Sequence, residues 1–356
     1  MIWNGTQRKT IFMLGAGATR GAFSHVRVRG KTIRAPLNWD FFNVVKAFVD
    51  AHGDHGGCAQ RYERVRRVFR DEFPTRGRWP IGMEEAFSLQ YVSKDFPEIY
   101  VPRRGRHRKA GSRREIEDFL RLTFGILSAI EEKVDPHNLY RRLVSHLTPG
   151  DTILTLNYDT LLDSALVEAG WDPAKGYGLI GGSGKIRWTR PRPAAAATLQ
   201  DVKLLKLHGS LNWYVRGSFA NLTQVFEKKP SKILVSQKPR VNEFQQYVRQ
   251  IAPPIYGKFF GHKHWRTLWA TAHEELVNTE VLVIIGCSLV DTDFHLGGML
   301  SHAVKIRKEQ NNRFTKVVAV DRTKVRRKWL RLLKGCVASQ KSYKWFDHFA
   351  NNHLKQ

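Results

Sequence analysis

Short apolar segments that alternate with amphipathic helices constrain the fold of this chain more than any other feature. Five segments have the length and the Val, Ile and Leu content of buried strands: residues 10–14, 151–156, 203–207, 280–285 and 316–320. Strands that alternate with helices are typical of a parallel sheet whose two faces are covered by helices. The sequence therefore predicts an α/β fold with a parallel sheet.

A mostly helical block interrupts this pattern after the first strand. From Asn38 to about residue 148 apolar residues recur at helical spacing, as in Phe41, Val45 and Phe48, and nothing there has the pattern of a parallel strand. We therefore expect residues 1–37 and 149–356 to form the α/β domain, and residues 38–148 to form a helical insert subdomain.

The composition is that of a folded protein with a large excess of positive charge. The 356 residues include 59 Lys and Arg against 32 Asp and Glu, a formal net charge of +27. Such a charge favours an anionic ligand or partner without choosing among them. No apolar run approaches the ~20 residues of a membrane-spanning helix, and the first residues lack the layout of a secretory signal. Three cysteines exclude a disulfide framework, so we expect a cytoplasmic protein that contacts no membrane.

A glycine-rich turn follows the first predicted strand. Gly15, Ala16 and Gly17 precede Thr19 in a Gly-x-Gly-x-x-x-Gly pattern, and glycines at such a turn let the backbone approach a pyrophosphate. The spacing is one residue longer than in the dehydrogenase fingerprint, and no second strand ends in an acid about 20 residues later. This pattern alone is therefore compatible both with a dinucleotide-binding site and with a plain strand-to-helix turn.

The next two predicted strands end in side chains suited to catalysis. Asn157 can orient a water or a ribose hydroxyl, and Asp159 can accept from hydroxyls or an amide. His208 follows the third strand, and an imidazole is the natural general base near neutral pH. Each residue also has a structural alternative: a helix cap for Asn157 or Asp159, and a buried histidine beside a glycine turn for His208.

The last two strands also end in polar or glycine residues. Gly286 and Ser288 offer backbone N–H groups and a hydroxyl, and the nearby Asp291 and Asp293 either serve the same edge or start the next helix. Asp321 follows the fifth strand, where an acid commonly binds a ribose.

In this order the strand-end residues resemble the sirtuin-like NAD-dependent family. Classical members carry a Gly-Ala-Gly turn, a Thr-Gln-Asn-x-Asp stretch, a catalytic His before Gly, and a late Gly-x-Ser. The chain has residues 15–17, 155–159, 208–209 and 286–288 at the matching places. The resemblance runs from residue 10 to about 322, with 38–148 as an insert, and it implies a Rossmann-like domain that binds NAD.

The chain departs from the deacetylases of that family. Those enzymes carry a four-cysteine zinc ribbon between the His-Gly and Gly-x-Ser motifs, whereas this chain has no cysteine between Cys58 and Cys287 and has Leu156 in place of Gln. His262, His264 and His273 have no cysteine or carboxylate at a spacing that supports a metal site. We therefore expect no zinc, no other bound metal and no protein deacetylation.

Residues 36–42 and 288–293 resemble instead the bacterial sirtuin-like NADases of anti-phage defence. That resemblance implies an NAD glycohydrolase, which cleaves NAD to nicotinamide and ADP-ribose as an abortive-infection effector. It also implies a homo-oligomer or a protein partner, such as a HerA/FtsK-type ATPase or an Argonaute.

The resemblance implies a role for each strand-end residue. Asn157 would hold the ribose or the attacking water, His208 would take a proton, and Asp159 would hold the nicotinamide ribose or amide. The remaining residues would bind the cofactor: Gly15, Ala16, Gly17 and Thr19 at the pyrophosphate turn, Gly286 and Ser288 at a phosphate or ribose, and Asp321 at the adenosine end.

Nucleic-acid binding is the competing function. One basic run covers residues 103–109 with Arg113 and Arg114, and a second covers residues 324–334. Each run alone can be a solvated face, but together, in a chain of this charge, they predict contact with an anionic partner. A nucleic-acid-binding module that uses the same fold for binding or ADP-ribosyl transfer is therefore the alternative, and it can coexist with NAD cleavage.

Overall fold

The computed structural model describes most of the chain, and every statement below concerns the residues that it describes. These are residues 8–23, 26–53, 57–72, 82–88, 113–133, 138–178, 184–187, 199, 201–216, 233–236, 247–252, 263–289 and 293–354. The chain divides into two compact units. The first comprises Met1–Ala22, Asp135–Ala252 and Phe259–Gln356, and the second Phe23–Val134 and Pro253–Lys258. No helix among the described residues is both long and apolar enough to cross a membrane.

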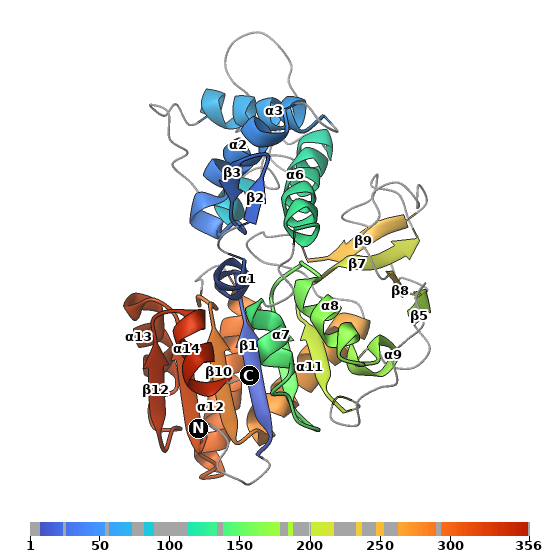
Figure 1. Cartoon of the computed structure of the whole chain (residues 1–356). Coiled ribbons are helices and arrows are strands. Elements are labelled where there is room, and N and C mark those ends of the chain that lie inside the picture. The colour runs from blue at the N-terminus through green and yellow to red at the C-terminus, as the bar shows by residue number, and fades with distance from the viewer. Residues whose placement is uncertain are drawn as a thin grey trace. The chain divides into compact units, whose positions relative to one another are not determined.

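The first unit is built on a six-stranded sheet in which every neighbouring pair of strands is parallel (Figure 1). In spatial order the strands are β12 (Gln340–Tyr343), β11 (Lys316–Val320), β10 (Val281–Ile285), β1 (Thr10–Leu14), β4 (Thr152–Thr155) and β6 (Lys203–Lys206). Counted along the chain and read from β6 to β12, this is the order 3-2-1-4-5-6 of the Rossmann fold. The predicted Rossmann-like α/β sheet is confirmed, and β12 is a sixth strand that the apolar pattern did not reveal.

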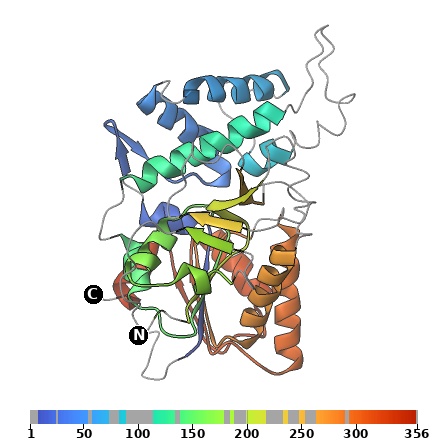
Figure 2. The same ribbon diagram turned by 90° about the vertical axis from the view of Figure 1, so that its right-hand side faces the viewer.

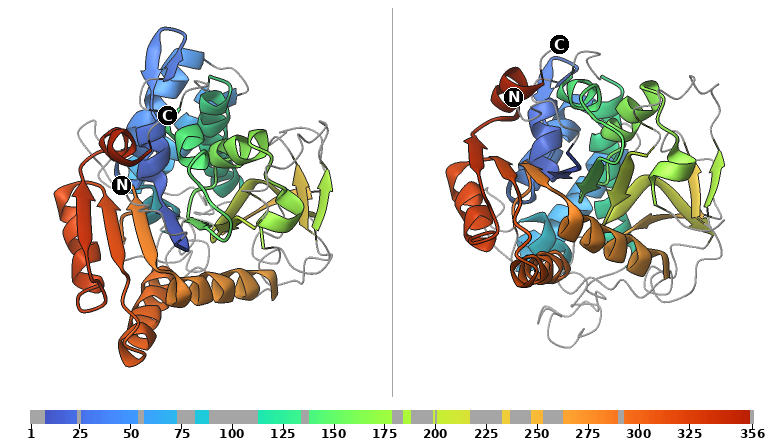
Figure 3. Two further views of the ribbon diagram at one scale, coloured as in Figure 1. Left: turned by 60° about the horizontal axis from the view of Figure 1, so that its bottom comes forward. Right: turned by 90° about the horizontal axis from the view of Figure 1, so that it is seen from below.

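Helices cover both faces of this sheet. One face carries α1 (Ala16–Ala22), α7 (Leu139–Val144), α8 (Leu161–Glu168) and α14 (Phe346–His353), and the other carries α11 (Lys263–Asn278), α12 (Phe294–Glu309) and α13 (Thr323–Leu332) (Figures 2 and 3). The faces differ because the chain moves from β1 toward β6 and later from β10 toward β12, and right-handed crossovers in opposite directions lie on opposite faces. With both faces covered, β1 and β10 are buried throughout, which explains their continuous apolar sequences.

A second sheet in the first unit has the order β5 (Gly184–Arg187), β8 (Ile233–Ser236), β7 (Gly209–Arg216), β9 (Tyr247–Ile251). The sequence did not predict this sheet. In β7 the polar residues Ser210 and Asn212 are buried, and Asn212 donates to the hydroxyl of Tyr177. Buried polar residues weaken the apolar alternation by which a strand is recognised.

The second unit contains an antiparallel hairpin, β2 (Val26–Val28) with β3 (Lys31–Ile33), followed by η1 (Asn38–Asp40), α2 (Phe41–His52), α3 (Cys58–Glu72) and α6 (Arg113–Glu131). Phe41 and Phe42 pack against Phe119 of α6, with ring centroids 5.3 and 5.5 Å away. The unit begins at Phe23 and leaves α7 in the first unit, so its boundaries differ from the expected 38 and 148. Residues 103–109 of the first basic run lie outside the described residues.

Candidate functional site

The five predicted strand-end motifs all lie at the carboxyl edge of the parallel sheet. Across the sheet they follow one another as Asp321 after β11, Gly286 after β10, Gly15 after β1, Asn157 after β4 and His208 after β6. Neighbouring strands are about 4.8 Å apart, so this row is about 19 Å long. The strand order reverses between β1 and β10, and ligands of open α/β sheets bind outside the carboxyl ends at such a reversal.

Close backbone packing explains the glycines at this reversal. The N–H of Gly15 donates to the carbonyl of Ile285 (3.1 Å), and that of Gly17 donates to the carbonyl of Gly286 (2.9 Å). A Cβ at Gly15 would lie 2.6 Å from the Cα of Cys287, and one at Gly17 would lie 2.7 Å from the Cα of Gly286. The two turns therefore need glycine because they pack directly against each other, which is a different reason from the pyrophosphate contact that the pattern suggested.

Thr19 of α1 joins three side chains in a buried network beneath the edge. Its hydroxyl donates to Asp159 Oδ2 (2.8 Å) and accepts from Asn157 Nδ2 (2.9 Å) and from the hydroxyl of Tyr140 (2.7 Å). A hydroxyl has one donor and two acceptor sites, so these contacts saturate it. Thr19 was expected to bind the cofactor, but its hydroxyl is instead committed to holding Asn157 and Asp159.

Asn157 is half-buried and has a fixed orientation. Its amide nitrogen donates to the carbonyl of Gly15 (3.0 Å) as well as to Thr19, which uses both amide hydrogens. Because the Gly15 carbonyl only accepts, the amide group cannot be turned round. The group that Asn157 offers to a ligand is therefore its Oδ1, a hydrogen-bond acceptor.

Asp159 is buried, with 5% of its surface exposed. Its Oδ2 accepts from Thr19 and its Oδ1 accepts from the N–H of Leu161 (3.3 Å) at the start of α8. Burial raises the pKa of Asp159, and the positive charge of Lys206 opposes that shift. These contacts connect Asp159 to the protein interior, where it orients Thr19.

Lys206, the last residue of β6, is a feature of the site that sequence reasoning missed. Its ammonium group is buried and donates to the backbone carbonyl of Asp159 and to Asp163 Oδ2 (2.9 Å). A buried lysine must be paired, because the desolvation of an isolated charge is costly. The signal was a lysine at the carboxyl end of the strand, between the apolar residues Leu205 and Leu207 and two residues before His208.

His208 is also buried, and it faces a carboxylate. Its Nε2 lies 2.8 Å from Asp293 Oδ2, and the two residues are 6% and 3% exposed. The ring centroids of Tyr158 and Trp269 each lie 6.4 Å from that of the imidazole. Asp293 also caps α12, so it both lies at this edge of the sheet and starts the next helix. Asp291 lies outside the described residues.

The remaining predicted residues differ in exposure. Ala16 and Ser288 are exposed, and the loop around Ser288 is held by α13, because Trp329 donates to the carbonyl of Cys287 (2.6 Å) and Lys328 donates to that of Leu289 (2.9 Å). Asp321 is half-buried, and burial raises its pKa. Asp321 and His208 end strands β11 and β6, with β10, β1 and β4 between them.

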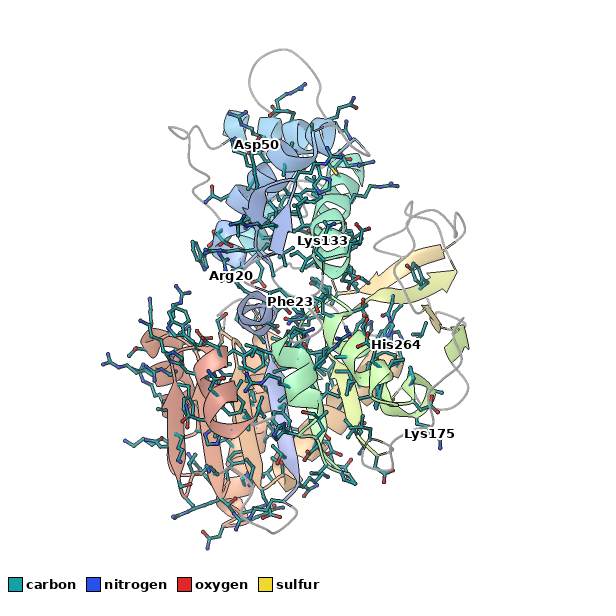
Figure 4. All side chains as sticks on the ribbon, in the orientation of Figure 1. Arg20, Phe23, Asp50, Lys133, Lys175 and His264 are labelled. Atoms are coloured by element: carbon teal, nitrogen blue, oxygen red, sulfur yellow. The ribbon has the colours of Figure 1, made fainter. Side chains whose placement is uncertain are left out.

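Figure 4 shows Arg20 on α1, a cation that lies three residues after Gly17 in the sequence. Among the described residues, no group of three or more His, Cys, Asp or Glu side chains could hold a metal ion. His273 of α11 and His302 of α12 form a pair at 2.9 Å. The expectation of no structural zinc stays a prediction.

Residues 151–335 match the family model described as a SIR2-like domain. This match covers more than half of the chain and includes Asn157, Asp159, His208, Ser288 and Asp321. A solved structure described as a mutant Sir2 with a p53 peptide and NAD aligns with 97% of this chain and 91% of its own, at 12% identity; its TM-score of 0.33 is too low for a conclusion. The chain matches no curated protein sequence. From the match over residues 151–335, the chain belongs to the SIR2-like family.

Proposed function

We propose that this protein hydrolyses NAD to nicotinamide and ADP-ribose. The observation that carries the proposal is an oriented amide, Asn157, and a carboxylate-paired imidazole, His208, at the ends of the adjacent strands β4 and β6 in a SIR2-like domain. In this reaction a water oxygen bonds to C1′ of the nicotinamide ribose and the bond from C1′ to the nicotinamide nitrogen breaks. Nicotinamide leaves as a neutral molecule with the electron pair, and one proton of the water is released.

The reaction needs positioning and a base more than it needs a strong nucleophile. Asn157 Oδ1 would accept a hydrogen from the attacking water or from a ribose hydroxyl. His208 would take the released proton. Because both oxygens of Asp159 accept from protein donors, Asp159 would act by orienting Thr19 and Asn157, in place of the direct contact with nicotinamide that the resemblance implied.

The chain has groups that fit the phosphates and riboses of NAD along the same edge. The N–H groups of Gly15 and Gly17 already donate to backbone carbonyls, so phosphates would contact the exposed Ala16 and Ser288. Arg20 would supply a cation at the same turn, and Asp321 would lie toward the adenosine end. The spacing of about 19 Å along the edge gives an extended dinucleotide room to contact several strand ends.

Product analysis tests the proposed reaction. Purified protein, alone and in its assembled form, is incubated with NAD, and nicotinamide and ADP-ribose are quantified. We expect the two products in equal amounts, without an acetylated peptide. Release of nicotinamide with ADP-ribose attached to a protein or nucleic acid would instead indicate transfer, and turnover that needs acetyl-lysine would indicate deacetylation.

A second candidate function is contact between α13 and an anionic partner. Lys324, Arg327 and Arg331 are exposed and recur every three or four residues along one side of this helix, whereas Trp329 is buried. Lys334 is exposed in the turn that follows the helix. We propose that this basic face binds nucleic acid or an acidic protein such as an oligomeric ATPase or an Argonaute complex. The logarithm of the nucleic-acid affinity should fall linearly with the logarithm of the salt concentration, with a slope near −0.9 per duplex phosphate neutralised. A protein interface should instead depend on salt mainly through its association rate.

We also propose that NAD cleavage serves anti-phage defence by a homo-oligomer or a complex. The support is the resemblance of residues 36–42 and 288–293 to defence NADases. Cells that express the protein should lose NAD after phage infection, and cells that express His208→Ala should not. Equal NAD levels in both cultures after infection would contradict this role.

A further inference from the structure

A buried lysine connects the two strand ends that carry Asn157 and His208. Lys206, the last residue of β6, is 1% exposed, and its ammonium group donates to the backbone carbonyl of Asp159 and to Asp163 Oδ2 (2.9 Å). Asp163 lies on α8 and is 2% exposed. One side chain of β6 therefore holds both the loop after β4 and the helix that follows that loop.

The loop after β4 is held from both sides of His208 in the sequence. The N–H of Leu211 donates to the carbonyl of Tyr158 (2.9 Å), and Lys206 donates to the next carbonyl along the chain, that of Asp159. One of these donors precedes His208 by two residues and the other follows it by three. Two successive carbonyls of the loop are therefore fixed against the segment that carries the imidazole.

Stability alone does not explain a buried ion pair at this edge of the sheet. The desolvation of the two charges offsets much of the gain from their attraction, and apolar residues of similar volume in place of such a pair often leave a protein equally stable or more stable. An apolar pair at positions 206 and 163 could pack in the same space, but it could not supply the hydrogen bond to the carbonyl of Asp159. This hydrogen bond is therefore the specific contribution of Lys206.

We propose that Lys206 is a positioning residue that holds the loop after β4 against β6 and so fixes Asn157 Oδ1 relative to His208. The connection runs through Asp159, because its carboxylate accepts from Thr19 (2.8 Å) and the hydroxyl of Thr19 accepts from the Asn157 amide (2.9 Å). The inference rests on the proposed function, in which Asn157 orients the attacking water or the ribose and His208 takes the proton. Lys206 acts on the reaction only through this geometry.

A double substitution removes this hydrogen bond without leaving a buried charge. Lys206→Met alone would leave the carboxylate of Asp163 buried without its cation, which destabilises a protein strongly. Lys206→Met/Asp163→Leu removes both charges, keeps similar side-chain volumes and leaves no side-chain donor at either position. Asp163 also accepts from the hydroxyl of Tyr177, to which the amide of Asn212 donates (3.2 Å). After a turn of that amide, Asn212 can accept from the same hydroxyl in the double variant.

The deciding experiment is hydrogen exchange of the side-chain amide of Asn157, measured by NMR on protein with ¹⁵N-labelled asparagine. The signals are assigned from their loss in Asn157→Asp. Exchange should be slow in the wild type, since the amide donates to the carbonyl of Gly15 and to Thr19. In the double variant it should be about fivefold faster or more, because the segment that holds these partners loses a hydrogen bond. An unchanged rate in the folded double variant would overturn the proposal.

Two controls separate positioning from a loss of overall stability. The amide of Asn312 after α12, which donates to the carbonyl of Val277 (3.1 Å), is the internal reference and should keep its wild-type exchange rate. Equal acceleration at both amides would mean that Lys206 only stabilises the fold, and it would overturn the proposal. Lys203→Met is the matched control, because Lys203 begins the same strand and pairs with Glu275 at the opposite edge (2.7 Å). It should leave the exchange of Asn157 unchanged.

Kinetics provide the second measurement. The double variant should lower kcat for NAD hydrolysis by about 10²-fold with a much smaller change in KM, because a displacement of about 1 Å in a reacting group can cost this much. Lys203→Met should keep kcat close to that of the wild type per folded molecule. Unchanged kcat in the double variant would also overturn the proposal. If the wild type releases no nicotinamide in any assembly, the proposed function fails, and the exchange rates still decide whether Lys206 positions Asn157.

Discussion

The two edges of the parallel sheet both bury charged and polar side chains, but they use them differently. At the amino edge Glu275 of α11 contacts Lys9 (2.8 Å) and Lys203 (2.7 Å), and it accepts from the hydroxyl of Thr152 (3.2 Å). Lys9 precedes β1, Lys203 begins β6 and Thr152 begins β4, so the carboxylate of Glu275 connects three strands. The amino edge is therefore a structural clamp.

The carboxyl edge has Thr19 at the comparable central position. Its partners are Asn157, Asp159 and Tyr140, and the amide of Asn157 keeps an acceptor beyond those contacts. His208 lies one strand farther along, against Asp293. The comparison teaches that a buried polar network can either connect strands or orient a group for a ligand. It can do the second only if one of its members keeps a hydrogen-bond donor or acceptor that the protein itself does not use.

The largest contrast between the edges should be catalytic. His208→Ala and Asn157→Ala should each lower NAD turnover by about 10²–10⁴-fold, because they remove the base or the group that orients water. Glu275→Gln, at the opposite edge, should turn over NAD at close to the wild-type rate per folded molecule. Product assays on the three variants, with circular dichroism to verify folding, provide the measurement. Full activity in both carboxyl-edge variants would remove the assignment of this edge as the active site.

A matched pair of Thr→Val substitutions should separate the edges by stability. Thr19→Val leaves buried groups of Asn157, Asp159 and Tyr140 without their shared partner and should cost about 3 kcal/mol in the free energy of unfolding. Thr152→Val removes a single contact to Glu275 and should cost about 1 kcal/mol. Denaturant unfolding of both variants measures the difference. Equal losses would mean that Thr19 is no more central to its edge than Thr152 is to the other.

The smallest expected effect is the pH dependence of the amino-edge clamp. Burial alone would raise the pKa of Glu275, but contacts with Lys203 and Lys9 outweigh it, so the pKa is lowered from 4.5. Because the pKa is lower in the folded state, the ionised group stabilises the protein above about pH 4.5, and this contribution is lost as the pH falls through the folded-state pKa.

The wild type should therefore be more stable than Glu275→Gln by about 1–2 kcal/mol at neutral pH, and the difference should shrink below about pH 4.5. Urea unfolding of both proteins from pH 7 to pH 3.5 tests this expectation. A difference that stays constant, or grows, as the pH falls would show that the carboxylate charge of Glu275 does not stabilise the clamp.

Much of the fold could be predicted because it depends on local pattern. The runs at residues 10–14, 280–285 and 316–320 are apolar since their strands are buried on both faces, and all three are observed as β1, β10 and β11. β12, with three exposed residues in the sequence Gln-Lys-Ser-Tyr, lacks such a run. It is one of the two edge strands of this sheet and is recognisable only from its pairing with β11.

The candidate site could be predicted in part for the same reason. Parallel strands bring their carboxyl ends to one edge, so the alternation of strands and helices was enough to place Asn157 and His208 together along it. The pattern did not reveal that Gly15 and Gly17 are required by contact with residues 286–287, or that Lys206 is buried beneath Asp159. Those facts depend on which elements meet in three dimensions.

By itself, then, the sequence determined the strands, their polar ends and the edge to which those ends belong, because apolar periodicity and residue type are local properties. The tertiary structure alone decided which polar groups are committed to the protein and which can meet a ligand. Thr19 donates a hydrogen bond to Asp159, 140 residues away, and His208 faces the carboxylate of Asp293 at the start of α12, in a separate part of the chain. Hydrogen-bond capacity is used up by whichever donors and acceptors folding brings within reach, and no local pattern records that choice.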